Sequence, residues 1–574
     1  MCLKTRIDVA TGREPADLVL KNGRIVNVLS CEIHEGDIAI AGDRIAGIGQ
    51  YEGKEAVDLA GRFVCPGFID GHVHIESSML SVPEFAKVVV THGTTAVVTD
   101  PHEIANVMGA EGIRYMLSSS KYCPIHVYFM ASASVPASPF ESAGAELRAL
   151  DLRPFLSDRW VLGLAEMMDY HGVVAADPEC LDKLRVADEQ PVDGHAPGLS
   201  GRDLCAYAAA GISTEHECTT LEEAHEKLRA GLTIMIREGS QARNLDALLP
   251  LVRPETLDRF MFVTDDKDVD ALLTEGHIDH VIRRAIQAGM EPVHAIKLVT
   301  INPARHFGLS QLGAVAPDRL ASLVVLDDLE QCRVSRVYCA GQLVAEDGQA
   351  LDLDQQVRRP QMLRSSINVH WMEPGEFAIP APHDGEFDVH VIEVMDDQIE
   401  TKRSIERVRS VGGQLRADPK LGLCKLAVVE RHQANGNVGL GFVRGLGFSA
   451  GAVASSVAHD SHNLIIAGTS DDDMFTAAVH LVKTRGGFCV VKDGEVLADV
   501  PLPIAGLMST ADAGTLSSQL RKLHEATRAL GGRLRRPFMA LSFLSLSVVG
   551  ELKLTDRGLV DVGKYELIDL LASE

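Results

Sequence analysis

Eight short apolar runs alternate with helical stretches between residues 63 and 305, and this alternation limits the fold more than any other feature of the chain. Apolar runs of this length predict strands that are buried on both faces, and a helix between successive strands predicts parallel pairing. Eight such repeats are typical of a closed (β/α)8 barrel, which is an α/β fold. The predicted strands are Phe68–Ile75, Thr94–Thr99, His126–Met130, Val161–Met167, Val192–His195, Ile212–His216, Leu232–Ile236 and Phe260–Thr264.

Segments on either side of the predicted barrel carry short alternating strands. Residues 1–62 and 306–350 both contain such pieces, and turn residues such as Asn22-Gly23 separate the pieces of the first segment. Because the two segments have the same character, we expect them to form one discontinuous β-sandwich. The barrel, residues 63–305, is then an insertion in this sandwich.

The last third of the chain follows a linker that is rich in Pro and Arg, from Arg358 to Pro382. Residues 370–574 combine β-like runs with a helical stretch over Ser517–Leu530. This mixture predicts a separate α+β domain. Its predicted strands are Phe387–Val394, Leu421–Val429, Leu464–Ala467 and Phe488–Val491.

Charge and cysteine content narrow the class of partner. The net charge of −25 argues against nucleic acid or an anionic membrane, because both attract a basic surface. The 11 cysteines are dispersed, as in a cytoplasmic protein with reduced thiols. The N-terminus has no apolar signal segment, and the longest apolar stretch, Phe538 to Val549, is too short to span a bilayer. We therefore expect a cytoplasmic homo-oligomer that acts on a small molecule.

His72 and His74 stand at the end of the first predicted barrel strand. Residues i and i+2 of a strand point to the same face, so both imidazoles project into one space. Two neutral imidazoles side by side, with further histidines and acidic residues downstream, are typical of a metal site.

The ends of four other predicted strands carry possible metal ligands. In a (β/α)8 barrel the carboxyl ends of all strands meet at one rim, where active sites lie. Glu166 could bridge two divalent cations, one held by His72, His74 and Asp265 and the other by His195 and His216. Any one of these residues could instead be structural, as a buried histidine bonded to the backbone or an aspartate that caps a helix. The coincidence of all six at one rim favours the metal site.

Longer sequence blocks resemble a known family. The block Pro66–His74 resembles the opening metal motif of the amidohydrolase superfamily, and Thr300–Arg305 resembles the exit from its barrel. Five further blocks are similar to the adenine deaminases of that superfamily, and the resemblance covers nearly the whole chain. They are His74–Met79, Thr99–Val107, Ala165–Met168, Asp193–Gly198 and Ala458–Asn463.

This resemblance implies hydrolytic deamination of adenine to hypoxanthine and ammonia, a reaction of purine salvage. It implies a binuclear centre bridged by Glu166, with Mn²⁺ or Fe²⁺ favoured and Zn²⁺ possible. A metal-bridged hydroxide would add to C6 of the purine. Asp265 is then expected to carry a proton to the leaving nitrogen, and Glu217 to protonate a ring nitrogen. His102 and Glu103 are expected to bind the substrate.

Two other functions stay open at this point. The chain could be another amidohydrolase that acts on a cyclic amide or amidine, or a non-catalytic scaffold with the same fold. A scaffold is expected to have lost metal ligands, and none is missing here. His459, Asp460 and His462 in the last domain could form a metal site or reach the barrel mouth, but a structural polar cluster is the interpretation that the sequence favours.

Overall fold

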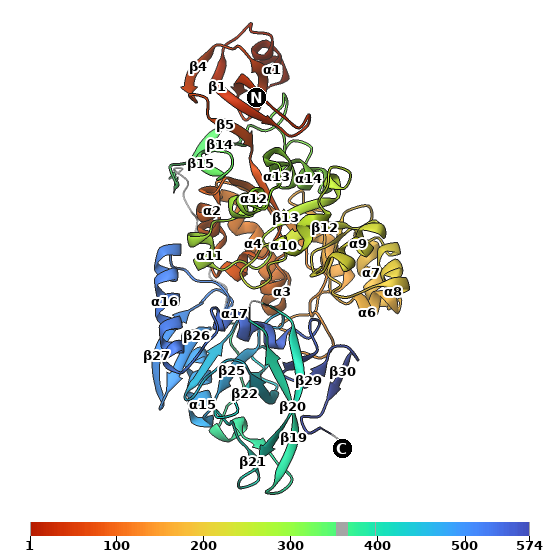
Figure 1. Ribbon diagram of the computed structural model, residues 1–574, viewed down its shortest axis with the longest axis vertical. Helices are drawn as coiled ribbons and strands as arrows, with labels where there is room; N and C mark the ends of the chain where they lie inside the picture. The colour runs from red at the N-terminus through yellow and green to blue at the C-terminus, as the bar shows by residue number, and fades with distance from the viewer. Residues whose placement is uncertain (1, 352–365, 397, 573–574) are drawn as a thin grey trace.

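The computed structural model describes residues 2–351, 366–396 and 398–572. It is elongated, with a β-sheet that includes the N-terminal strands at one end, the barrel in the middle and the C-terminal domain at the other end (Figure 1). The predicted linker residues Arg358–Pro360 lie outside the described residues.

The eight predicted inner strands form the barrel. A five-stranded parallel sheet runs in the order β10-β9-β8-β7-β6, and a three-stranded parallel sheet comprises β11, β12 and β13. Hydrogen bonds close the gaps between them, from the Ser213 amide to the Val192 carbonyl (2.9 Å) and from the Asp265 amide to the His72 carbonyl (2.9 Å). The predicted (β/α)8 fold is thus confirmed. The strands are β6 (Phe68–Val73), β7 (Thr94–Thr99), β8 (His126–Ala131), β9 (Val161–Met167), β10 (Val192–Gly194), β11 (Thr214–Glu215), β12 (Thr233–Arg237) and β13 (Phe260–Val263).

Helices cover the outside of this barrel and bury an apolar stripe against it. On α2, for example, Phe85, Ala86 and Val89 are buried in the main hydrophobic cluster. The helices are α2 (Val82–Val90), α3 (His102–Met108), α4 (Ala110–Ser119), α5 (Ala149–Leu156), α6 (Tyr170–Val174), α7 (Pro178–Val186), α8 (Gly201–Ala209), α9 (Leu221–Arg229), α10 (Leu245–Leu248), α11 (Val269–Thr274), α12 (Ile278–Gln287), α13 (Pro292–Leu298) and α14 (Ile301–His306).

Both segments that flank the barrel contribute to one nine-stranded sheet, next to the short helix α1 (Leu3–Ala10). In Figure 1 the red strands β1 and β5 and the green strands β14 and β15 lie at the same end of the molecule, although they are far apart in the sequence. The strands are β1 (Ala16–Asn27), β2 (Glu32–Ala41), β3 (Arg44–Gly49), β4 (Gly53–Asp58), β5 (Phe63–Pro66), β14 (Leu323–Asp328), β15 (Arg333–Cys339), β16 (Gln342–Glu346) and β17 (Gln349–Ala350).

Two details of this sheet differ from the prediction. Residues 63–66 form β5, which pairs with β14 and β1, so the barrel begins only after Pro66. The predicted turn at Asn22-Gly23 is a β-bulge inside the long strand β1, where the pairing with β2 shifts between Leu20 and Gly23. Asn22 has a left-handed φ of 57°, as is common in turns. Here this conformation forms a bulge, and the chain continues in the same direction along β1.

The C-terminal domain contains an eight-stranded sheet in the order β20-β19-β23-β22-β25-β24-β26-β27. The predicted helix is observed as α16, which contacts both β27 and the barrel helix α11. The main elements are β19 (Glu386–Val394), β20 (Thr401–Arg409), β22 (Leu423–Val429), β23 (Val438–Arg444), β24 (Ala452–Ser455), β25 (Leu464–Gly468), α15 (Asp471–Thr484), β26 (Gly487–Lys492), β27 (Glu495–Pro501), α16 (Ala513–Ala529), α17 (Pro537–Ser542), η6 (Phe543–Ser545), β28 (Leu552–Thr555), β29 (Gly558–Asp561) and β30 (Glu566–Ile568).

The longest apolar stretch of the sequence packs inside the protein. Its residues form α17 and the 3₁₀ turn η6, and Phe538, Leu541 and Leu544 are buried. Within the ranges that the structure describes, no helix combines the length and the apolar character needed to cross a membrane.

Candidate metal centre

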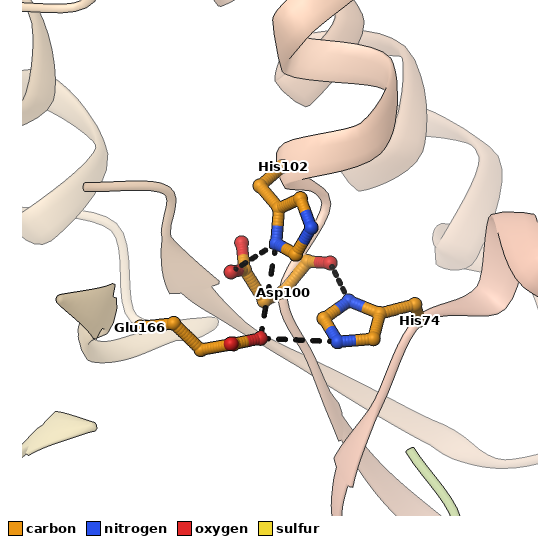
Figure 2. Close-up of side chains that lie close together, drawn as sticks. All are labelled: His74, Asp100, His102 and Glu166. Atoms are coloured by element: carbon orange, nitrogen blue, oxygen red, sulfur yellow. Dashed lines mark hydrogen bonds and ion pairs between the residues drawn. The ribbon is translucent and has the colours of Figure 1, made fainter. Parts of the chain in front are cut away.

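His72 and His74 extend from the end of β6 into the mouth of the barrel. Both are buried, and their ring centroids lie 4.9 Å apart. The Nδ1 of His74 lies 3.0 Å from the carbonyl oxygen of Asp100, a contact that Figure 2 shows. Because a carbonyl only accepts, Nδ1 carries the proton and the Nε2 lone pair of His74 faces the centre of the barrel.

Glu166 at the end of β9 lies between two pairs of histidines. Its Oε1 is 3.3 Å from His72 Nε2 and 3.1 Å from His74 Nε2. Its Oε2 is 2.9 Å from His195 Nδ1 and 3.3 Å from His216 Nε2. Burial raises the pKa of this carboxyl, but the histidines outweigh burial and hold the pKa well below its usual range. The Glu166 carboxylate is therefore ionised, and each of its two oxygens contacts a different pair of imidazoles.

The loops after β10 and β11 hold the second pair of histidines. The backbone amide of His195 donates to the Tyr207 hydroxyl (2.9 Å), which donates in turn to the carbonyl of Met167 (2.8 Å). The ring of His216 stacks on that of His72, with centroids 4.3 Å apart. The first set of contacts ties the end of β10 to the end of β9, and the stacked rings tie the end of β11 to the end of β6.

Asp265, just after β13, completes the ring of side chains. It has a left-handed φ of 57°, which Asp tolerates better than most residues. Its Oδ1 lies 3.4 Å from His74 Nε2 and 3.9 Å from His72 Nε2. The structure therefore brings all six predicted metal ligands together at the rim.

This set of atoms fits divalent cations. Two ligand atoms that are each about 2.1 Å from one ion lie about 3.0 to 3.4 Å apart at octahedral to tetrahedral angles. The contacts of Glu166 with the four histidines span 2.9 to 3.3 Å. His72 Nε2 and Glu166 Oε1 are buried and have no hydrogen-bond partner among the described residues. Such unpaired buried atoms are costly unless an ion satisfies them.

Arg237 is a residue of the site that the sequence analysis missed. It ends β12, is buried, and its Nη1 and Nη2 contact the two oxygens of Glu217, the Nη2 contact being 2.6 Å. Nη1 also lies 3.0 Å from Asp265 Oδ2. Burial raises the pKa of Glu217 and Asp265, but Arg237 and the nearby histidines together outweigh burial and hold each pKa below its usual range. The sequence feature that could have identified Arg237 is its position, since it is a charged residue at the end of an apolar strand.

Asp100, at the end of β7, was also missed. Its Oδ2 lies 2.7 Å from His102 Nδ1, and its Oδ1 accepts from the Ser132 hydroxyl at 2.7 Å. Figure 2 shows Asp100 with His74, His102 and Glu166 at the mouth of the barrel. Asp100 lies within the block Thr99–Val107 that resembles the adenine deaminases, but the sequence analysis gave it no role.

His102 and Glu103 lie at the start of α3, beside the six converging residues. His102 Nδ1 is 3.8 Å from Glu166 Oε1. Glu103 contacts two histidines of the C-terminal domain, with His459 Nε2 3.1 Å from its Oε1 and His462 Nε2 next to its Oε2. The loop with residues 459–462 therefore reaches the barrel mouth, which was one of the alternatives that the sequence left open.

A cavity opens between this centre and the C-terminal domain. Most of its polar lining comes from the barrel, including His102, Glu166, Glu217, Arg237 and Asp265, and the C-terminal domain adds His459 and Asp460. The apolar side chains that line it include three from the C-terminal domain and one from the barrel. These are Ile399, Phe543, Leu546 and Met168. The lining therefore places apolar side chains opposite the polar groups of the centre.

Comparison with known proteins gives the family. A model of the amidohydrolase family matches residues 63–344, and a model described as the adenine deaminase C-terminal domain matches residues 398–566. Adenine deaminase 2 of Carboxydothermus hydrogenoformans is 46% identical over 567 residues, covering 99% of each chain. Adenine deaminase of Geobacillus kaustophilus is 46% identical over 575 residues, also covering 99% of each chain.

The chain belongs to the adenine deaminase family. The matched adenine deaminase C-terminal domain contains the loop with His459, Asp460 and His462. A solved structure described as an adenine deaminase is 19% identical, covers 57% of this chain and 99% of its own, and superposes with a TM-score of 0.43.

Proposed function

We propose that this chain is a metal-dependent adenine deaminase, which converts adenine and water to hypoxanthine and ammonia. Full-length relatives named adenine deaminase support the choice of substrate. The observation that carries the mechanism is the position of Glu166, whose two oxygens are divided between two pairs of histidines. A carboxylate in that position suits a bridge between two ions.

The ligand set supports two divalent cations. His72, His74 and Asp265 would hold one ion, and His195 and His216 the other, with Glu166 shared. Nitrogen and oxygen ligands suit Mn²⁺ or Fe²⁺, with Zn²⁺ as an alternative. Once bound, such ions lower the pKa of water far enough to supply a nucleophile at neutral pH.

Asp265 is the proposed proton carrier. Its Oδ2 accepts from Arg237, while its Oδ1 points to the centre, where it would contact both the ion and the attacking water. The ion pair with Arg237 keeps this carboxylate ionised and able to accept a proton from the attacking water. Asp265 then delivers that proton to the exocyclic nitrogen, which leaves C6 as ammonia.

Glu217 lines the same cavity, but its pairing suits a role different from the one that the sequence suggested. Both of its oxygens contact Arg237, and its pKa lies well below the usual range because Arg237, His195 and His216 together outweigh burial. A carboxylate held in this way is a poor proton donor at neutral pH. We propose that Glu217 instead accepts a hydrogen bond from an N–H of the purine ring. His102 and Glu103 are proposed to line the opposite side of the substrate.

Further properties of the protein are proposed from its composition and from the proposed reaction. The 11 free cysteines support a cytoplasmic location, and the net charge of −25 supports the absence of nucleic-acid and membrane partners. A place in purine salvage follows from the proposed reaction. A homo-oligomeric state stays a prediction, which sedimentation would measure.

Ammonia release from adenine by Mn²⁺-loaded protein tests the proposal. We expect Glu166→Gln to abolish the activity, because the neutral amide cannot bridge two cations. Glu111→Gln is the matched control, since Glu111 is exposed and pairs with Arg114 on the surface, and it should keep full activity. Fully loaded wild-type protein that leaves adenine intact, whether it releases ammonia from another cyclic amidine, opens the ring of a cyclic amide or acts on no substrate, would overturn the assignment to adenine.

A further inference from the structure

We propose a separate site for a single divalent cation where the barrel meets the C-terminal domain, formed by His102, Glu103, His459 and Asp460. Glu103 Oε1 lies 3.1 Å from His459 Nε2 and 3.4 Å from His102 Nε2. Asp460 Oδ1 lies 3.8 Å from His102 Nε2. All four residues are at most 3% exposed.

Hydrogen bonding fixes the tautomer of His102. Its Nδ1 lies 2.7 Å from Asp100 Oδ2, while the other oxygen of Asp100 accepts from the Ser132 hydroxyl. Since the Asp100 carboxylate only accepts, Nδ1 of His102 carries the proton. The Nε2 of the neutral ring therefore presents a lone pair toward Glu103 and Asp460. A carboxylate behind the imidazole is the arrangement that orients many metal-binding histidines.

The same reasoning applies to His459. Its Nδ1 lies 3.1 Å from the hydroxyl oxygen of Ser542. That hydroxyl already donates its proton to the carbonyl of Met539 at 2.7 Å. The oxygen can therefore only accept from His459, and the Nε2 of the neutral ring presents its lone pair to Glu103 Oε1.

His462 has the opposite tautomer and plays a supporting role. The backbone amide of Ala458 donates to its Nδ1 at 3.2 Å, so Nε2 carries the proton of the neutral ring. This Nε2 contacts Glu103 Oε2 and donates to it. His462 thus holds one oxygen of Glu103 and leaves the other, Oε1, directed at His102 and His459.

Buried ligand atoms of His102, Glu103 and Asp460 lie within 4.8 Å of one another, and His459 Nε2 lies 3.1 Å from Glu103 Oε1. Glu103 Oε1 and His459 Nε2 are buried and have no hydrogen-bond partner among the described residues. One divalent cation bound between these side chains would satisfy them, and two imidazoles with two carboxylates suit Zn²⁺ or Mn²⁺.

This site is distinct from the centre at Glu166. It lies on the Nε2 side of the His102 ring, whereas the Nδ1 side faces Asp100 and Glu166. Two of its ligands come from α3 of the barrel and two from the loop after β24 in the C-terminal domain. The cation would therefore join the two domains directly beside the substrate cavity, to which His102, Glu103, His459 and Asp460 all contribute.

Metal content of the full-length protein after saturation with Zn²⁺ or Mn²⁺, followed by removal of free ions, tests this proposal. We expect His459→Gln and Asp460→Asn each to bind one ion fewer per chain than wild type. His480→Gln is the matched control, because His480 lies on α15 of the same domain, pairs with Asp499 and is partly exposed. It should bind as many ions as wild type. Because the difference between proteins is measured, the test does not depend on the number of ions at Glu166.

Anomalous scattering from wild-type crystals grown with Zn²⁺ gives a second readout that needs no variant. The proposal predicts a peak within about 2.5 Å of both His102 Nε2 and His459 Nε2, apart from any peak at Glu166. A map with no peak there, or His459→Gln protein with the ion content of wild type, would overturn the proposal. Loss of adenine deamination with this peak retained would count against the proposed function alone.

Discussion

Replacement of Arg237 by Met tests whether its positive charge stabilises the two buried carboxylates at the barrel mouth. Arg237 is 3% exposed and contacts the buried carboxylates of Glu217 and Asp265. Removal of one partner from a buried ion pair costs about 3–5 kcal/mol, because the other charge is left uncompensated. For a unit of the size of the barrel, about 2–4 °C per kcal/mol converts this loss to a fall of about 6–20 °C in the midpoint of thermal unfolding.

The assay is scanning calorimetry in the presence of a chelator, so that bound ions do not replace the lost charge. Arg237→Lys should fall between wild type and Arg237→Met, since Lys keeps the charge but not the planar fork that reaches both oxygens of Glu217. The double variant Glu217→Gln with Arg237→Met should melt above Arg237→Met alone, because it removes one of the uncompensated carboxylates. A fall of less than about 2 °C for Arg237→Met, or a double variant that melts below the single one, would refute this reasoning.

Three further predictions concern single residues. Asp265→Asn should lower kcat for ammonia release by about 10²- to 10⁴-fold with full metal content, as expected for loss of a proton carrier, and unchanged kcat would reject that role. Tyr207→Phe should cost about 1–3 kcal/mol of stability, because the buried amide of His195 loses its acceptor, and calorimetry would show the lower midpoint. Lys553 is fully buried, and burial lowers its pKa from 10.5 to about 7. Between pH 7 and about 10 the unfolded chain therefore binds a proton at Lys553 that the folded protein lacks. The stability of wild type should rise with pH in this range relative to that of Lys553→Met. Midpoints of thermal unfolding that change in parallel with pH in the two proteins would contradict this prediction.

The barrel could be predicted from the sequence because its strands are local features. The predicted bounds of β7 and β9 coincide with the observed ones, since polar residues and turns border both apolar runs. The turn predicted at Asn22-Gly23 failed because pairing with β2 along the whole of β1 outweighed a local preference. Likewise, β5 belongs to the outer sheet because its pairing with β14 depends on a strand more than 250 residues away.

The site could be predicted only where its residues follow the barrel repeat. His72, His74, Glu166, His195, His216 and Asp265 all stand at strand ends, which the topology brings to one rim. Arg237 and Asp100 also stand at strand ends, but a single polar residue gives no indication of its partner. The position of the His459 loop depends on how the C-terminal domain packs on the barrel, and that packing involves contacts between residues remote in sequence.

The central claim is that Glu166 bridges two ions at the mouth of the barrel. Anomalous scattering from crystals grown with Mn²⁺ tests it most directly. The account predicts two peaks at Glu166, one beside each carboxylate oxygen, with His72 and His74 at the first and His195 and His216 at the second. A single peak, or none, at Glu166 in protein that deaminates adenine at its full rate would contradict the account.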